Sequence, residues 1–256
     1  MIQKRHEENE KKLADDNFQT NYWGHKTFLR RIGNHTEKYI ERARVLSSIV
    51  NNSPSLVLDF RFENKLKQIS AQKSLFRQIA EVININRSYH EPFQLHFCNL
   101  DKNGWFNENY GKILSFDNNM VFDTSKSYMD IFPREKLVYL SRDAKTTMKY
   151  FDPNKVYIIG AMIDKGPSDF LYASYGQAKQ DKIECQRLPL DNYVKFAGGK
   201  NLNIDHMTRI LINLYHNHSD WEKALRESLP KRKVQSFNSD VKARTDLYQN
   251  RKKQFT

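Results

Sequence analysis

Short apolar runs and amphipathic segments alternate along most of this chain. Residues 156–160 read Val-Tyr-Ile-Ile-Gly, a nearly continuous apolar run with β-branched residues that a glycine closes. Such a run is typical of a central strand in a parallel sheet. Similar short runs predict further strands over residues 55–60, 93–98, 137–141 and 185–188. Because helical patterns separate these strands, we predict an α/β protein of βαβ units, with helices on both faces of a parallel sheet.

The predicted helices follow from apolar residues that recur every three or four positions. One helix is expected over residues 65–86 and another around residues 175–182. A flexible loop over residues 197–204 leads into a third helix, and Ser219 with Glu222 forms a capping box that opens a fourth. The apolar stripes of the first and third helices are Ile69, Phe76, Ile79, Ala80 and Ile83, and Met207, Ile210, Leu211 and Leu214.

Two stretches have weaker patterns. Residues 101–130 are rich in Asn, Asp and Ser, and their aromatic residues follow no period, so we expect a helix and long loops there. Ser141 with Asp143 could cap the segment through Tyr150 as a further helix. The predicted sheet therefore depends mainly on the other segments.

The first 50 residues carry no strand pattern. Residues 37–46 read as a basic helix with apolar positions at Ile40, Ala43 and Leu46. Aromatic residues alternate with cations here, as on surfaces that contact phosphates and stack on bases, although an ordinary amphipathic helix would look similar. We interpret residues 1–50 as a basic helical extension that contacts RNA through Lys26, Arg30, Arg31, Lys38, Arg42 and Arg44.

The composition favours a nucleic-acid partner. The 256 residues include 42 Lys and Arg against 30 Asp and Glu, which gives a formal net charge of +12. A polyanion such as nucleic acid is the usual partner of such a chain, and a generally basic, solvated surface is the alternative. Cys98 and Cys185 have neither disulfide density nor metal-ligand spacing, which indicates a reducing compartment. No apolar run approaches the roughly 20 residues that span a bilayer, so no membrane partner is expected.

Candidate chemistry lies at the end of the predicted central strand. Ligands of open α/β sheets bind at the carboxyl ends of the strands, and Asp164 follows Gly160 at that end. Capping of a turn or a helix is the alternative role for this carboxylate. The nine glycines form neither G-x-G-x-x-G nor a G-K-[ST] loop, so a dinucleotide or P-loop signature is excluded. His216 and His218 lack further ligands, and no metal is expected.

Five motifs follow one another along the chain: Leu140-Ser141, Tyr157 to Lys165, Arg187 to Tyr193, Lys200 to Met207 and Asp220 to Leu225. In this order they resemble the SPOUT-class tRNA methyltransferases that modify the purine at position 9. Together with the run from Pro133 to Leu140, they resemble most the mitochondrial branch of that family, the methyltransferase subunits of protein-only ribonuclease P. The resemblance implies a SPOUT methyltransferase domain over residues 51–233, with a C-terminal trefoil knot, followed by a basic tail over residues 234–256.

The resemblance also implies S-adenosylmethionine as the methyl donor and a set of site residues. Asp164 matches the proposed general base of the family, and Gln78 matches a glutamine placed near the target base. Asp205 is a second carboxylate to test, but some relatives carry Asn there, so we do not expect it to be an essential proton acceptor. The cofactor is expected to lie against Leu140, Gly160, Asp164, Leu188, Pro189, Leu190, Lys200, Asn201, Leu202, Asn203 and Ile204.

The expected activity is methylation of N1 of guanine or adenine 9 in tRNA and precursor tRNA. In this family the mitochondrial member forms a complex with a short-chain dehydrogenase and supports a separate nuclease subunit, so we expect both partners and the mitochondrial matrix. Residues 1–12 lack the acid-poor character of a transit peptide, and no import signal is visible. The alternative is an RNA-binding scaffold that presents precursor tRNA to the nuclease, with methylation weak or lost.

Two departures from the family pattern affect the expected substrate contacts. The loop over residues 165–172 is longer and less regular than the usual loop of the family. His206 replaces a common glutamine in the last cofactor motif. The expected cofactor site is compatible with both changes.

Overall fold

The structure is a computed structural model, and the chain divides into two units, residues 1–40 and residues 41–256. In the first unit, the two-residue strands β1 (Gln19–Thr20) and β2 (Lys26–Thr27) pair antiparallel, so the expectation of no strand in the first 50 residues is wrong at these positions. The second unit contains the main sheet and most of the helices. The residues that the structure describes are 19–20, 26–27, 34–114, 121–163, 172–199 and 201–240.

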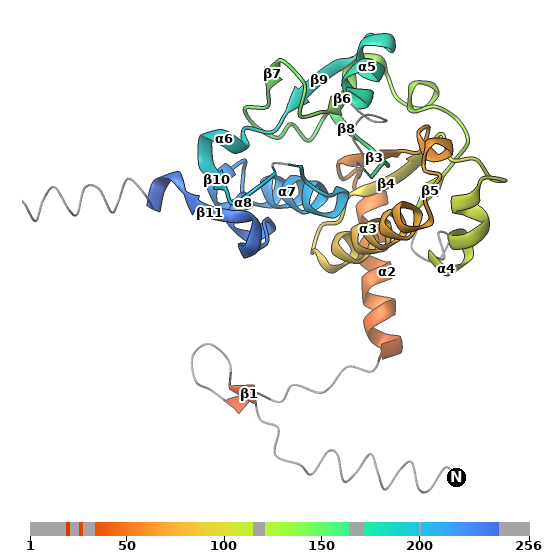
Figure 1. Ribbon diagram of the computed structural model, residues 1–256. Coiled ribbons are helices and arrows are strands. Elements are labelled where there is room, and N and C mark those ends of the chain that lie inside the picture. Colours follow the sequence, from red (N-terminus) through yellow and green to blue (C-terminus); the bar gives the residue numbers. More distant parts are fainter. Residues whose placement is uncertain are drawn as a thin grey trace, which may run out of the picture. The chain divides into compact units, whose positions relative to one another are not determined.

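The second unit is built on a seven-stranded sheet in which every neighbouring pair of strands is parallel. The strand order is β5-β4-β3-β8-β6-β9-β7, which places β8 at the centre (Figure 1). All five residues of β8 are buried, so the predicted central strand is confirmed. The bounds are β3 Ser55–Asp59, β4 Gln94–Cys98, β5 Phe122–Asp123, β6 Leu137–Leu140, β7 Thr146–Thr147, β8 Val156–Gly160 and β9 Glu184–Arg187.

Helices of very different length surround this sheet, and a small second sheet pairs β10 (Val194–Phe196) with β11 (Val234–Phe237) antiparallel. The α-helices are α2 Asn34–Val50, α3 Ile69–Ser88, α4 Lys112–Leu114, α5 Ala173–Gln180, α6 Leu190–Tyr193, α7 Ile204–His216 and α8 Trp221–Ser228. Single turns of 3₁₀-helix or π-helix are η1 Glu63–Lys65, η2 Asn107–Gly111, η3 Tyr128–Asp130, η4 Arg134–Lys136 and η5 Lys231–Lys233.

The two faces of the main sheet carry two different cores, because successive side chains of a strand point to opposite faces. Leu56 and Leu58 of β3 belong to a large apolar cluster to which α3, α7 and α8 contribute. Val57 of β3 belongs to a smaller cluster with Ala178 of α5. Figure 1 accordingly shows α3 and α7 on one side of the strands and α5 on the other, which confirms the predicted helices on both faces.

The predicted buried side of α2 is wrong. Leu46 is 50% exposed and Ala43 is also exposed, whereas Val45 and Ser48 are buried. The Ser48 hydroxyl donates to the Val45 carbonyl at 2.7 Å, and this lets a polar residue face the core. The position of the apolar residues alone therefore does not show which side of this helix packs. In α3, Ile69 of the predicted stripe is 68% exposed, because it is the first residue of the helix.

Two predicted helix starts also differ from the structure. The segment from Ser141 to Tyr150 is not helical, because Thr146–Thr147 form strand β7 against β9. The Ser141 hydroxyl accepts from the Asp143 amide at 3.2 Å in a turn. The last predicted helix is present, but its N-cap is Asp220, which accepts from the Lys223 amide at 3.1 Å.

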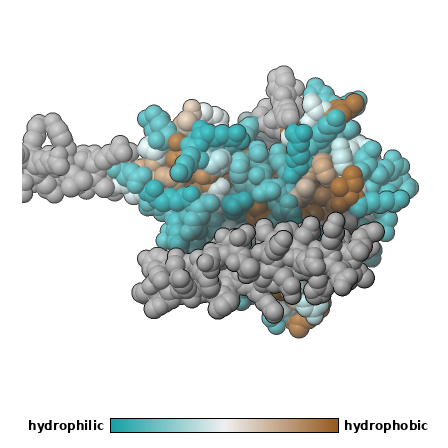
Figure 2. Space-filling model, turned by 90° about the horizontal axis from the view of Figure 1, so that it is seen from below, coloured by the Kyte–Doolittle hydropathy of each residue, from teal (hydrophilic) through white to brown (hydrophobic). Residues whose placement is uncertain are grey.

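The surface is mostly hydrophilic, with smaller apolar areas between, in the view of Figure 2. Among the described residues, no helix is both long and apolar enough to cross a membrane. The C-terminal trefoil knot stays a prediction, as do the domain limits at residues 50 and 233. Strand β11 lies within the predicted basic tail and pairs with β10.

Candidate active site

A pocket of about 280 Å³ opens at the carboxyl ends of β6, β8 and β9, where a parallel sheet is expected to bind its ligand. Asn203 is the N-cap residue of α7 beside this pocket, and Asp164 and Lys200 lie outside the described residues. Among the expected cofactor contacts, those that line the pocket are Leu140, Gly160, Leu188, Pro189, Leu190, Asn201, Leu202 and Ile204. The structure thus brings together residues from four separate motifs, and their contact with a cofactor stays a prediction.

Gly160 forms the floor of the pocket. A methyl group in place of its hydrogen would lie 3.3 Å from the Ser174 hydroxyl and 3.3 Å from the Tyr139 hydroxyl, and it would collide with the end of the Met162 side chain. Glycine therefore fits this strand end because neighbouring side chains already fill the space that a Cβ atom would need. Ser174, on the opposite wall, belongs to the first turn of α5.

Charged side chains at the rim were not predicted. Arg142 donates to the Asn201 side chain, and its Nε lies 3.6 Å from the Asp143 carboxylate. Arg187 donates from Nε to the Thr147 hydroxyl at 3.0 Å. These residues follow or end β6 and β9, so the rule that ligands bind at strand ends could have identified them.

Gln78 links α3 to the pocket. Its Oε1 accepts a hydrogen bond from the Ile204 amide at 3.0 Å, across 126 positions of the chain. Ile204 is the first residue of α7, and the Asn203 side chain makes no cap hydrogen bond there. The Gln78 side chain, from the neighbouring helix α3, therefore caps the N-terminus of α7. Its expected contact with the target base stays a prediction.

The second carboxylate, Asp205, lies in the first turn of α7 beside His206. The Asp205 Oδ2 atom is 3.7 Å from His206 Nε2. Asp205 Oδ1 and His206 Nδ1 are buried without a hydrogen-bond partner among the described residues. Burial lowers the pKa of His206, and the Asp205 charge opposes this shift. The neighbouring Lys233 donates to the Asn201 carbonyl at 2.6 Å and so holds the last cofactor motif in place.

The predicted RNA contacts are distributed over the two units. Lys38 lies exposed on α2 in the first unit, and Lys26 lies in β2. In the second unit Arg42 is exposed and Arg44 is half-buried. Arg30 and Arg31 lie outside the described residues. The described residues also contain no group of three His, Cys, Asp or Glu side chains that could hold a metal ion.

The chain is similar to curated proteins over most of its length. Over 214 residues it is 34% identical to tRNA methyltransferase 10 homolog C of Xenopus tropicalis, covering 82% of this chain and 46% of that protein. Over 219 residues it is 31% identical to the mitochondrial ribonuclease P protein 1 homolog of Drosophila melanogaster, covering 82% of this chain and 47% of that protein. The chain thus spans about half the length of these relatives.

A solved structure shares the fold. The crystal structure of the complex of full-length spTrm10 with SAH is 32% identical and matches with a TM-score of 0.59, over 69% of this chain and 97% of that chain. The parallel sheet with helices on both faces is thus the SPOUT fold of that enzyme. The family model described as tRNA (guanine(9)-N(1))-methyltransferase TRM10/TRM10A matches residues 2–234, and the chain belongs to this family.

Proposed function

We propose that this chain transfers a methyl group from S-adenosylmethionine to N1 of the purine at position 9 of tRNA. The observation that carries the proposal is the pocket at the strand ends, which collects residues from four motifs of a methyltransferase family. A relative of the same fold is known as a complex with SAH, the product form of that methyl donor. The net charge of +12 supports an RNA substrate.

The described pocket fits S-adenosylmethionine. Apolar side chains of Leu140, Leu188 and Leu202 form walls suited to an adenine ring, and Gly160 adds no side chain of its own between them. Arg142 and Asp191 add charged groups at the rim that can bind the polar ends of the molecule. When bound, S-adenosylmethionine supplies an electrophilic methyl group.

Asp164 is proposed as the general base, and the expectation is specific to guanine. N1 of guanine carries a proton that must leave as the methyl group arrives, and a positioned carboxylate that accepts it contributes roughly 10²–10⁴-fold in rate. N1 of adenine carries no proton at neutral pH. Asp164→Asn should therefore reduce methylation of guanine 9 far more than methylation of adenine 9. Equal losses on both substrates would show that Asp164 positions substrate or cofactor instead.

We further propose that the protein acts as the tRNA-binding methyltransferase subunit of protein-only mitochondrial ribonuclease P. Its expected partners are a short-chain dehydrogenase and a separate nuclease subunit, in the mitochondrial matrix. The support is the similarity to the Drosophila melanogaster relative, whose name calls it a mitochondrial ribonuclease P protein 1 homolog. The described residues proposed to contact tRNA are Lys26 of β2, the exposed Lys38 and Arg42 of α2, and the half-buried Arg44 of the same helix.

Primer extension on unmodified tRNA transcripts tests the activity and its position together. N1 methylation blocks the pairing edge of the base, so reverse transcriptase should stop at position 9 after incubation with the protein and S-adenosylmethionine, with or without the dehydrogenase. A transcript with a pyrimidine at position 9 is the matched control and should give no stop. Full-length products from the purine transcripts, with tRNA bound and the dehydrogenase present, would favour the scaffold over the enzyme.

A further inference from the structure

Helix α5 forms a wall of the pocket but has little apolar contact with the sheet. Ala173 and Ser174 line the pocket, and Ala178 is the one residue of Ala173–Gln180 that is buried. Tyr172, at the N-cap position, makes no side-chain cap hydrogen bond. A helix of eight residues is not stable by itself, because nucleation costs more than so few hydrogen bonds return. Other contacts must therefore hold this wall in place.

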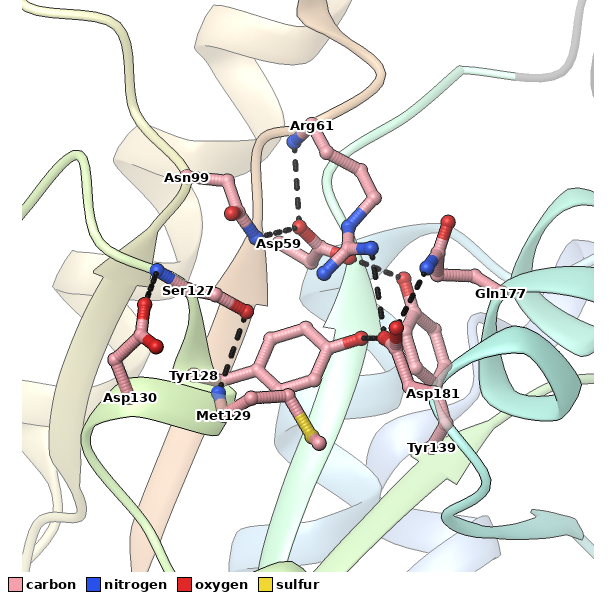
Figure 3. Close-up of polar contacts among 10 residues, drawn as sticks. All are labelled: Asp59, Arg61, Asn99, Ser127, Tyr128, Met129, Asp130, Tyr139, Gln177 and Asp181. Carbon is pink, nitrogen blue, oxygen red and sulfur yellow. Dashed lines mark hydrogen bonds and ion pairs between the residues drawn. The ribbon is translucent and has the colours of Figure 1, made fainter.

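A buried polar cluster holds the C-terminal end of α5 (Figure 3). Asp181, the C-cap residue, accepts from the Tyr128 hydroxyl and from Gln177 Nε2, the latter at 3.0 Å. Its Oδ2 lies 3.4 Å from Arg61 Nη1. A carboxylate at the C-terminal end of a helix is unfavourable for the helix dipole. Its position here is explained by Arg61 and Tyr128 and not by the helix itself.

Arg61 connects Asp181 to the centre of the sheet. Its Nε lies 2.8 Å from Oδ2 of Asp59, the last residue of β3. The Asp59 side chain is fully buried. Asn99 donates to Asp59 Oδ1 at 2.7 Å, and the Tyr139 hydroxyl donates to Oδ2 at 2.9 Å. Burial raises the pKa of Asp59, and the Arg61 charge opposes that shift. Arg61 is thus the cation that compensates two carboxylates on different elements.

The same cluster reaches the pocket floor. Asp59 is the strand partner of Gly160, and its carbonyl accepts from the Ala161 amide at 2.9 Å. The Tyr139 hydroxyl, which donates to Asp59, lies 3.3 Å from the position that a Cβ atom on Gly160 would take. A connected set of ion pairs and hydrogen bonds therefore runs from the α5 wall through Arg61 to the floor of the pocket.

We propose that Arg61 is a positioning residue for the methyl donor. It is not among the residues that line the pocket; it holds the α5 wall against the β8 floor through Asp181 and Asp59, and so sets the affinity of the pocket for S-adenosylmethionine. The inference rests on the proposed function, because it takes this pocket as the cofactor site.

The test compares cofactor binding, tRNA binding and catalysis in the full chain. Asp181→Asn keeps an oxygen for the Tyr128 hydroxyl but removes the charge that faces Arg61. Calorimetry should show S-adenosylmethionine binding weakened about tenfold, a loss between those typical of exposed and of buried ion pairs. The tRNA affinity should stay within twofold, and the rate at saturating S-adenosylmethionine should be retained while its KM rises. A general loss of stability would not produce this separation below the melting temperature.

Two further variants sharpen the result. Arg61→Lys keeps the charge but cannot bridge two carboxylates as a planar guanidinium does, so its affinity should fall between that of the wild type and that of Asp181→Asn. Lys155→Met removes a charge pair of 3.3 Å with Glu184 at the other end of β8 and should leave cofactor affinity unchanged. If Arg61→Lys does not fold, Asp181→Asn decides the question alone.

The outcomes separate this inference from the proposed function. If wild-type protein does not bind S-adenosylmethionine, the assignment of the pocket is wrong. If the wild type binds and Asp181→Asn binds equally well, the pocket stands and the positioning role of Arg61 is wrong. A loss of tRNA affinity as large as the loss of cofactor affinity would also overturn it.

Discussion

The two faces of the sheet use the same strands in different ways. Toward α3, α7 and α8, the strands present Leu56, Leu58, Phe97 and other apolar side chains to a large, continuous core. Toward α5, the same strands present Asp59 and His96 among the residues of a smaller core. Apolar burial is non-directional and grows with area, whereas charged hydrogen bonds fix geometry. We infer that the first face decides whether the domain folds and the second decides where the α5 wall of the pocket lies.

The largest effect is expected from a change on the apolar face. Leu211 of α7 is fully buried in the large cluster, so Leu211→Ala removes buried methyl groups and leaves a cavity. The free energy of unfolding should fall by about 2–5 kcal/mol. Urea unfolding followed by circular dichroism measures this change. Ile69→Ala, at a position 68% exposed, is the matched control and should change stability by less than about 0.5 kcal/mol.

A small effect of Leu211→Ala would contradict the inferred division of roles between the two faces of the sheet. A loss below about 1 kcal/mol for Leu211→Ala would be far under the usual cost of such a cavity. It would mean that the apolar face is not the main source of stability. The polar face would then have to contribute to folding as well as to the geometry of the pocket.

The polar face should make the free energy of unfolding fall in acid. His96 of β4 lies between the rings of Phe122 and Phe132, at centroid distances of 4.8 and 5.0 Å, and burial lowers its pKa to about 4. The folded protein keeps this side chain neutral where the unfolded chain already takes up a proton. The stability that the neutral ring contributes is therefore complete above about pH 6.5 and is lost as the pH falls toward 4. Between pH 7 and pH 5 the loss should be about 2 kcal/mol.

Urea unfolding at pH 7 and pH 5 measures this loss, and His96→Phe should reduce it, since a phenyl ring fits the same aromatic neighbours. His90→Gln, at an exposed position, is the control and should leave the pH dependence as in the wild type. An unchanged acid sensitivity in His96→Phe would show that other groups of the polar face determine it.

The sequence predicts the apolar face better than the polar one, for a physical reason. The run Val156–Gly160 and the stripe of α7 are local patterns, and the structure confirms both. The cluster around Arg61 has no local pattern, because Asp181 lies 120 positions away along the chain and reaches Arg61 only in the folded state. The family resemblance predicted part of the pocket lining but not Arg142, Ser174 or Arg187, and periodicity alone showed only the strand end.

The smallest predicted effect concerns Gln78 of α3, the helix on the apolar face, whose side chain accepts from the amide of the pocket residue Ile204. Gln78→Met removes the acceptor for the Ile204 amide at nearly constant volume, so the domain should lose about 1 kcal/mol, as for other lost N-caps. Because Ile204 lines the pocket, affinity for S-adenosylmethionine should fall as well. Calorimetry with the cofactor and urea unfolding measure the two effects, and an unchanged affinity would show that the cap does not position the pocket.

Gln78→Glu separates the cap from the expected role near the target base. A carboxylate still accepts from the Ile204 amide, and its charge is favourable at the N-terminus of α7, so cofactor affinity should be retained. The variant lacks the amide NH₂ group, however, which is the part of Gln78 left to contact a base. A slower single-turnover rate with normal cofactor affinity would assign Gln78 to both roles. A normal rate would leave it as a positioning residue that joins the apolar face to the pocket.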